Sequence, residues 1–279
     1  MNISCLPVSI FGDICSGQME IAGWAAAAKE IGYDGIDISI LFLKNRTPTY
    51  LAKLRRDLEA VGLPLVMMTT YPDFTHPDPV QRERELLHLQ SDVALCSEIG
   101  VRYLRILAGQ AHPESPAEAC VAWTAENFQI IDGYARRFGV GLVFENHGKP
   151  GAWDQVDFTF EPRHFLDICQ RIRDTGIRVN FDTGNITAHG EDPMEFLPLV
   201  LDLVETIHVT DMAERGRFSP TVIGTGVTPN REVFRYLREQ GFDNWLCIEE
   251  ASGNGLPGIR DAYHYVKNLW EEAGLPSNS

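Results

Sequence analysis

The chain has 279 residues, of which 44% are hydrophobic and 23% are charged, so it has the composition of a globular protein and not of a fibrous or disordered one. Its 24 basic and 39 acidic residues give a formal net charge of −15, which argues against a nucleic-acid partner because the phosphate backbone is also negative. No apolar run reaches the roughly 18 residues that span a bilayer, and the N-terminal segment lacks the basic start of a signal peptide, so we expect a cytoplasmic protein without a membrane partner.

Short apolar runs alternate with amphipathic stretches along the whole chain. The runs are rich in Val, Ile, Leu and aromatic residues, which predicts strands buried on both faces of a parallel sheet. The predicted strands are Ile3–Ile10, Gly35–Ile40, Leu65–Thr70, Tyr103–Ala108, Val140–Asn146, Arg178–Thr183, Thr206–Thr210 and Trp245–Glu250. The stretches between them have helical apolar spacing, and several open with Pro. The predicted helices are Met19–Ile31, Pro79–Ile99, Pro116–Phe138, Pro162–Arg173, Pro193–Leu203, Asn230–Gln240 and Gly258–Ala273.

Glycine stands just after most of these helices. It does so at Gly32, Gly100, Gly139, Gly176 and Gly241, each followed within a few residues by a strand. A left-handed helix C-cap favours glycine, so the pattern predicts repeated β/α units with no linker between them. We therefore predict an α/β fold, a single (β/α)8 TIM barrel that spans residues 1–279 as one domain, rather than a doubly wound sheet with a second domain.

Four successive strands carry an ionisable side chain where they end. These residues are Glu145, Asp182, His208 and Glu249. The active site of such a barrel lies at the C-terminal strand ends, where buried carboxylates need a cation. Because oxygen dominates this set and no thiolate is present, it suits one divalent ion, with Mn²⁺ or Mg²⁺ preferred and Co²⁺ or Zn²⁺ as alternatives. The alternative interpretation is that each acid opens a polar loop and faces solvent.

With these motifs the chain resembles the xylose isomerase-like TIM-barrel superfamily. Its members include ketose 3-epimerases, hydroxypyruvate isomerases, inosose dehydratases, 3-dehydroshikimate dehydratases and endonuclease IV. The resemblance covers nearly the whole chain and rests on Gly-Tyr-Asp-Gly-Ile-Asp at 32–37, Glu-x-His at 145–147, Asp-Thr-Gly-Asn at 182–185 and the two later strand ends. It implies a Mn²⁺-type site on Glu145, Asp182, His208 and Glu249, in which the two glutamates also form an acid/base pair.

Two further residues gain a role from the resemblance. His147 matches a histidine that resembles the general base of the dehydroshikimate dehydratases, and it follows Glu145 by two, on the same face of an extended strand. A substrate hydrogen-bond donor or an ordinary loop residue are the alternatives for it. Asn185 stands where several epimerases carry a substrate-contacting histidine, and this departure weakens a specific assignment as a ketose 3-epimerase.

Three loop residues are further candidates for substrate binding. His76 lies in a long Pro-rich loop that could cap the substrate or serve as a rigid connector. Arg215 and Arg217 could hold a hydroxyl or phosphate oxygen through their forked donors, or could belong to a solvated loop. Asp211 is interpreted as supporting His208 or binding a second metal ion.

The predicted function is a metal-dependent isomerase or epimerase of a small sugar or keto-polyol, acting through an enediolate. The first alternative is a dehydratase of the same superfamily with His147 as base. A DNA-repair endonuclease related to the AP endonucleases is disfavoured by the net charge and by the missing histidine ligands of a trinuclear site. A barrel that binds such a metabolite without turnover is the fourth reading. Phosphorylation of the substrate and the oligomeric state stay open, with a homo-oligomer among the alternatives.

Overall fold

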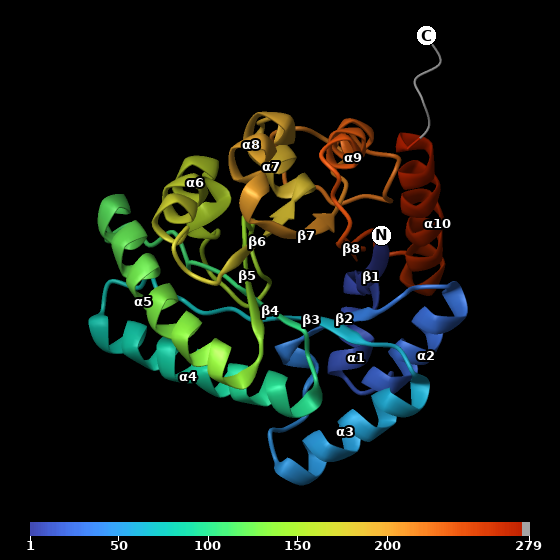
Figure 1. Ribbon diagram of the computed structural model, residues 1–279, viewed down its shortest axis with the longest axis horizontal. Coiled ribbons are helices and arrows are strands. Elements are labelled where there is room, and N and C mark those ends of the chain that lie inside the picture. Colours follow the sequence, from blue (N-terminus) through green and yellow to red (C-terminus); the bar gives the residue numbers. More distant parts are fainter. Residues whose placement is uncertain (275–279) are drawn as a thin grey trace.

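The computed structural model describes residues 1–274, in which eight parallel strands form one sheet with helices around it (Figure 1). The strands are β1 (Asn2–Leu6), β2 (Ile36–Ser39), β3 (Leu65–Thr69), β4 (Tyr103–Ile106), β5 (Gly141–Glu145), β6 (Arg178–Asp182), β7 (Val204–Val209) and β8 (Trp245–Glu249). Their order is β1-β8-β7-β6-β5-β4-β3-β2, and the two outermost strands of this order, β1 and β2, are also neighbours. The sheet is thus a nearly closed (β/α)8 barrel, as predicted.

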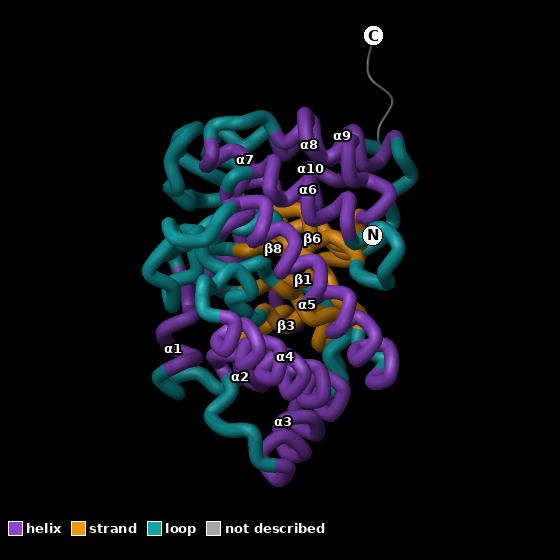
Figure 2. The backbone as a smooth tube through the Cα atoms, turned by 90° about the vertical axis from the view of Figure 1, so that its left-hand side faces the viewer, coloured by secondary structure: helices purple, strands orange, loops and turns teal. Residues whose placement is uncertain are grey.

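Helices enclose the strands, and Figure 2 shows them outside the central sheet. They are α1 (Phe11–Cys15), α2 (Ile21–Ile31), α3 (Pro48–Val61), α4 (Pro79–Ile99), α5 (Ala117–Phe138), α6 (Pro162–Arg171), α7 (Thr183–His189), α8 (Pro193–Val200), α9 (Asn230–Glu239) and α10 (Gly255–Ala273). Among the described residues, none of these helices combines the length and the apolarity that crossing a membrane requires.

The prediction that glycine follows the ends of helices is confirmed at four of the five positions. Gly32, Gly100, Gly139 and Gly241 follow helices and have φ values of 116°, 83°, 68° and 73°, a region that side chains with a Cβ rarely adopt. Gly176 is the exception, because α6 already ends at Arg171 and Ile172 is its C-cap.

The structure differs from the predicted elements in several places. The first strand ends at Leu6 and not at Ile10, because Pro7 cannot donate to the ladder and the chain turns into a 3-10 helix over Val8–Ile10. Helix α3 was not predicted, although its buried Leu51, Leu54 and Leu58 have helical spacing. A further short helix, α7, starts directly after β6.

The side chains inside the barrel change from apolar to polar along the strands. Near the N-terminal strand ends it is filled by apolar side chains, including Met67, Tyr103, Val143 and Trp245. Toward the C-terminal ends the buried side chains become polar, and these ends open into a cavity. Packed side chains therefore close the barrel at the N-terminal strand ends, and the C-terminal strand ends are where an active site can form.

Candidate metal centre and active site

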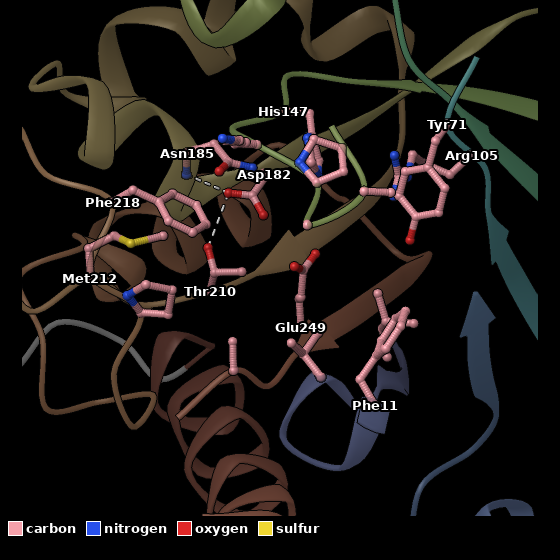
Figure 3. Close-up of a pocket in the computed structure, with 18 of the residues that line it drawn as sticks. Phe11, Tyr71, Arg105, His147, Asp182, Asn185, Thr210, Met212, Phe218 and Glu249 are labelled. Carbon is pink, nitrogen blue, oxygen red and sulfur yellow. Dashed lines mark hydrogen bonds between the residues drawn. The ribbon is translucent and has the colours of Figure 1, made fainter. Parts of the chain in front are cut away.

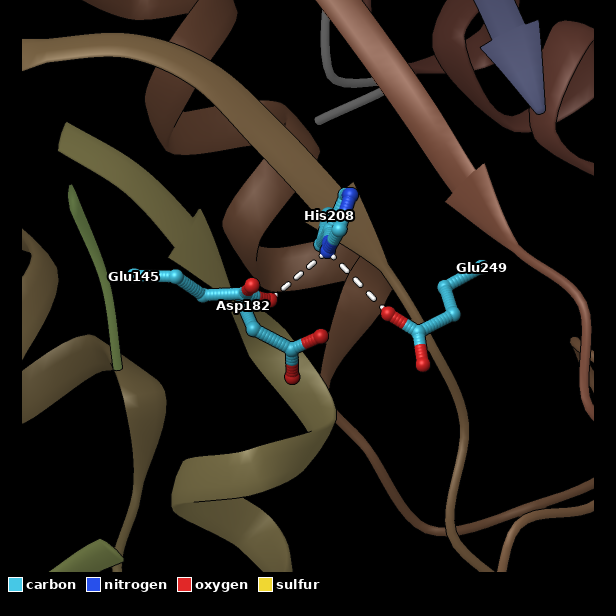
Figure 4. A group of neighbouring side chains, drawn as sticks. All are labelled: Glu145, Asp182, His208 and Glu249. Carbon is cyan, nitrogen blue, oxygen red and sulfur yellow. Dashed lines mark hydrogen bonds and ion pairs between the residues drawn. The ribbon is translucent and has the colours of Figure 1, made fainter. Parts of the chain in front are cut away.

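The four predicted metal ligands lie together at the C-terminal ends of β5 to β8. Each of Glu145, Asp182, His208 and Glu249 offers one ligand atom, and these atoms all lie within 4.8 Å of one another. We call these four residues the metal-ligand group. His208 stands between the two glutamates, with Nδ1 2.7 Å from Glu145 Oε1 and 3.2 Å from Glu249 Oε2 (Figure 4). Parallel pairing brings them together, since Asp182 is the register partner of His208 on the neighbouring strand.

The donor set fits a divalent cation. The side chains of Glu145 and His208 are fully buried, and Asp182 Oδ2 is a buried oxygen without a hydrogen-bond partner. Burial and the charges of Glu145 and Glu249 raise the pKa of Asp182 well above its ordinary value. Three carboxylates packed so closely repel one another unless positive charge is added, and a divalent ion with oxygen and imidazole ligands supplies it.

His208 and Arg105 together hold the Glu145 carboxylate in its charged form. This arginine is 1% exposed, its Nε lies 3.0 Å from Glu145 Oε2, and its Nη1 donates to the Thr70 carbonyl. Burial alone would raise the pKa of Glu145, but the charges of His208 and Arg105 outweigh it and lower that pKa to about 2. Glu145 is therefore a carboxylate at neutral pH.

Residues around the metal-ligand group are fixed by hydrogen bonds across strands. The Asn146 side chain donates to the Asp182 carbonyl at 2.8 Å and accepts from the Asp182 amide at 2.9 Å. Asp182 Oδ1 accepts from the Asn185 amide and from Thr210 Oγ1, at 2.6 and 3.1 Å. The Asn185 side chain donates to the Asn146 carbonyl. These bonds set the direction in which Asp182 presents its free oxygen.

His147 also lines the cavity, as the strand pattern suggested. Its Nδ1 has no hydrogen-bond partner and lies 3.9 Å from Asp157 Oδ2, a buried oxygen that also lacks one. The other Asp157 oxygen accepts from the Thr159 amide and hydroxyl, both at 2.7 Å. Burial lowers the pKa of His147 to about 4, so the ring is neutral at neutral pH and able to accept a proton.

This shift predicts a pH dependence of stability. The pKa of His147 is about 4 in the folded chain and about 6.5 when unfolded, so between these values the unfolded state alone binds the proton, and stability falls as the pH falls. In His147→Asn the free energy of unfolding should fall less steeply, by up to about 1.4 kcal/mol per pH unit. Urea unfolding in chelator from about pH 6.5 to 4.5 measures this. The exposed His88→Asn should follow the wild type, and parallel profiles for His147→Asn and wild type would refute the prediction.

A cavity of about 620 Å³ lies over the metal-ligand group. Asp182 and Glu249 line it, together with Arg105, His147 and Asn185 (Figure 3). Its volume is within the range of about 300–1,000 Å³ that is usual for small-molecule sites.

The structure does not bring the loop candidates to this cavity. His76 lies outside its lining, packs edge-on against His112 at 4.9 Å and accepts from the Asp78 amide. Arg215 and Arg217 are exposed and outside the lining as well, and Arg217 pairs with Glu214. Asp211 does line the cavity, but its carboxylate caps a loop by accepting from the amides of residues 224, 226 and 228. It is not a member of the metal-ligand group.

Sequence reasoning missed Arg105, Asp157 and Tyr71. Arg105 was detectable, since a charged residue inside the apolar run Tyr-Leu-Arg-Ile needs a buried partner. Asp157 and Tyr71 lie in loops whose path over the barrel mouth has no periodic signal.

Comparison with known proteins gives consistent matches. The chain matches the family model described as a xylose isomerase-like TIM barrel over residues 25–269. The inosose dehydratase of Bacillus anthracis (strain CDC 684 / NRRL 3495) is 22% identical over 292 residues, covering 94% of this chain and 89% of that protein. The structure of L-ribulose 3-epimerase has a TM-score of 0.77 at 15% identity and covers 98% of this chain and 96% of its own. The IolI protein with a bound zinc atom also has a TM-score of 0.77, at 16% identity, with 98% and 99% covered.

Proposed function

Because the chain belongs to the xylose isomerase-like TIM barrel family, we propose that it is a divalent-metal-dependent isomerase or epimerase of a small sugar or keto-polyol. The observation that carries the proposal is the pair of carboxylates, Glu145 and Glu249, on either side of His208 in one metal-ligand group (Figure 4). Mn²⁺ is the ion we favour from the oxygen-rich donor set, and the zinc in the IolI structure supports a divalent ion in this fold.

The chemistry is a proton transfer at a carbon next to a carbonyl. A divalent ion held by the metal-ligand group would polarise that carbonyl and the neighbouring hydroxyl, and so acidify the C–H between them. One glutamate takes the proton, which leaves an enediolate, and the other returns it. Return to the same carbon from the opposite face gives the epimer, and return to the neighbouring carbon gives the aldose–ketose isomer. His208 and Arg105 keep Glu145 in its charged form.

A dehydratase of the same family is the second candidate. Two observations favour it: the neutral imidazole of His147 faces the same cavity as Glu249, and the curated relative reported above is an inosose dehydratase. In this reaction His147 takes the proton and a hydroxyl leaves from the β carbon, so that water is lost and an enone forms.

One incubation in D₂O separates these reactions. We expect the Mn²⁺-loaded protein to introduce deuterium beside the carbonyl of one member of a ketose and inosose panel, with an epimer or aldose as product. Mass spectrometry and NMR follow the exchange, and ultraviolet absorbance of a conjugated enone would identify the dehydratase instead.

Metal removal is the control for this experiment. Chelation should reduce the exchange rate to that of the buffer, and added Mn²⁺ should restore it. Full activity in chelator would contradict the proposed function for either reaction.

A further inference from the structure

The cavity over the metal-ligand group is lined by both polar and apolar side chains. The apolar side chains come from both halves of the chain, and we call six of the larger ones the apolar wall. They are Leu6, Val8, Phe11, Leu41, Met212 and Phe218. Phe11 and Phe218 appear at opposite sides of the cavity in Figure 3, with Glu249 between them. Aromatic rings therefore border the cavity on two sides of Glu249.

Two members of the apolar wall stay exposed to solvent. Phe218 is 49% exposed and Leu41 is 48% exposed, although both border a concave site. The Phe218 ring lies close to Gly148: a Cβ added there would be 3.0 Å from Phe218 Cε2 and 2.7 Å from Asn185 Oδ1. Phe11 is fixed by an edge-to-face contact with Phe42 at 4.6 Å. Exposed apolar groups gathered around a pocket mark a surface that a ligand covers.

Three polar groups of the lining make bonds within the protein. The Tyr71 hydroxyl lies 3.0 Å from Ser39 Oγ and 3.2 Å from Thr69 Oγ1. Lys149 donates to the Asp154 carbonyl at 3.0 Å, and Arg105 is paired with Glu145. Within residues 1–274, Lys149 and Arg105 are the Lys and Arg residues of the lining, and the acidic side chains of Asp211 and Glu249 line it as well. Because Arg105 is paired with Glu145, a phosphate would meet one lysine beside these acidic groups, and this charge balance disfavours a phosphate.

From this lining we propose that the substrate is an unphosphorylated keto sugar or cyclic polyol that carries an apolar substituent, with the substituent packed against the apolar wall. The inference rests on the proposed function, which concerns the part of the substrate next to the metal-ligand group. It adds the chemical class of the substituent at the other end of the substrate. It gives Phe218, Phe11 and Leu41 a role in specificity.

Hydroxamates test the two ends separately, since their paired oxygens bind divalent metals while the tail can be varied. We would titrate desalted Mn²⁺-loaded protein with acetohydroxamate, hexanohydroxamate and gluconohydroxamate by calorimetry. Each buried methylene strengthens binding about fourfold, so hexanohydroxamate should bind at least about tenfold more tightly than acetohydroxamate. It should exceed gluconohydroxamate, which has the same chain length and a hydroxylated tail, by a similar factor.

Variants locate the effect. Phe218→Ala and, separately, Leu41→Ala should reduce the ratio of hexanohydroxamate to acetohydroxamate affinity at least threefold, since each removes apolar contact area from the wall. Leu199→Ala is the control, because Leu199 is 55% exposed but lies on α8 outside the cavity lining. This variant should keep the wild-type ratio.

The outcomes separate the inference from the proposed function. Equal affinity for the acetyl and hexanoyl probes, or tighter binding of the gluconyl probe than of the hexanoyl one, would overturn the inference while leaving the metal site standing. Failure of all three probes to bind would overturn the metal site and the inference with it.

Discussion

Glu249→Gln is expected to lower kcat for proton exchange by about 10²–10⁴-fold, whichever reaction the enzyme catalyses. The substitution keeps the shape of the side chain but removes one proposed negative metal ligand and one proposed proton-transfer group. Glu249 is the member of the glutamate pair that lines the cavity directly, with a side chain 21% exposed. The measurement is the deuterium exchange rate at saturating Mn²⁺, with metal content determined on the same sample.

The neighbouring residue supplies a matched control. Glu250 is 1% exposed, and its Oε1 accepts from the Ser252 amide, outside the metal-ligand group. Glu250→Gln is the same chemical change one residue along, and we expect kcat to stay within about threefold of wild type because general acid–base catalysis is untouched. An unaffected kcat in Glu249→Gln would refute its assignment.

Arg105→Met is expected to lower the free energy of unfolding by about 3–5 kcal/mol in the presence of chelator, because it leaves the Glu145 carboxylate buried without its arginine. Methionine fills much of the same volume without a charge, so the loss reports electrostatics more than packing. Urea unfolding measures the effect. Mn²⁺ should recover part of it by placing another positive charge beside Glu145.

Two comparisons make this prediction specific. Arg231→Met breaks an exposed ion pair with Glu272 and should cost at most about 1 kcal/mol. The double variant Arg105→Met/Glu145→Gln should be more stable than Arg105→Met alone, because the uncompensated charge is gone. If Arg105→Met cost no more than Arg231→Met, the buried pair would not be holding Glu145 in its charged form.

The sequence was most informative where the barrel rule applies. The residues Glu145, Asp182, His208 and Glu249 are up to 104 positions apart (249 − 145), yet parallel strands align their ends, so four strand ends predict one group. His147 and Asn185, to which the resemblance to the superfamily gave a role, also line the cavity. Periodicity was not enough for Asn185, because it lies on α7, a short helix that was not predicted.

The rest depends on contacts that periodicity does not encode. Arg105 points at Glu145 only because β4 and β5 are neighbours in a particular register. The loop candidates His76, Arg215 and Arg217 lie in irregular segments. The path of such a loop over the barrel depends on side-chain hydrogen bonds, such as those of Asp211, which residue spacing does not predict. Helix α3 was missed for a simpler reason, since its first turn follows a polar segment at residues 44–47 that resembles a long loop.

All four members of the metal-ligand group come from β5 to β8, whereas Leu6, Val8, Phe11 and Leu41 of the apolar wall come from the first 41 residues. Under the two proposals, binding of the ion and selection of the substrate would depend largely on different halves of the chain. A mutant library confined to the first half would then alter which compound is accepted without changing any of the four proposed ligands, so that new specificities would arise while the reaction is retained.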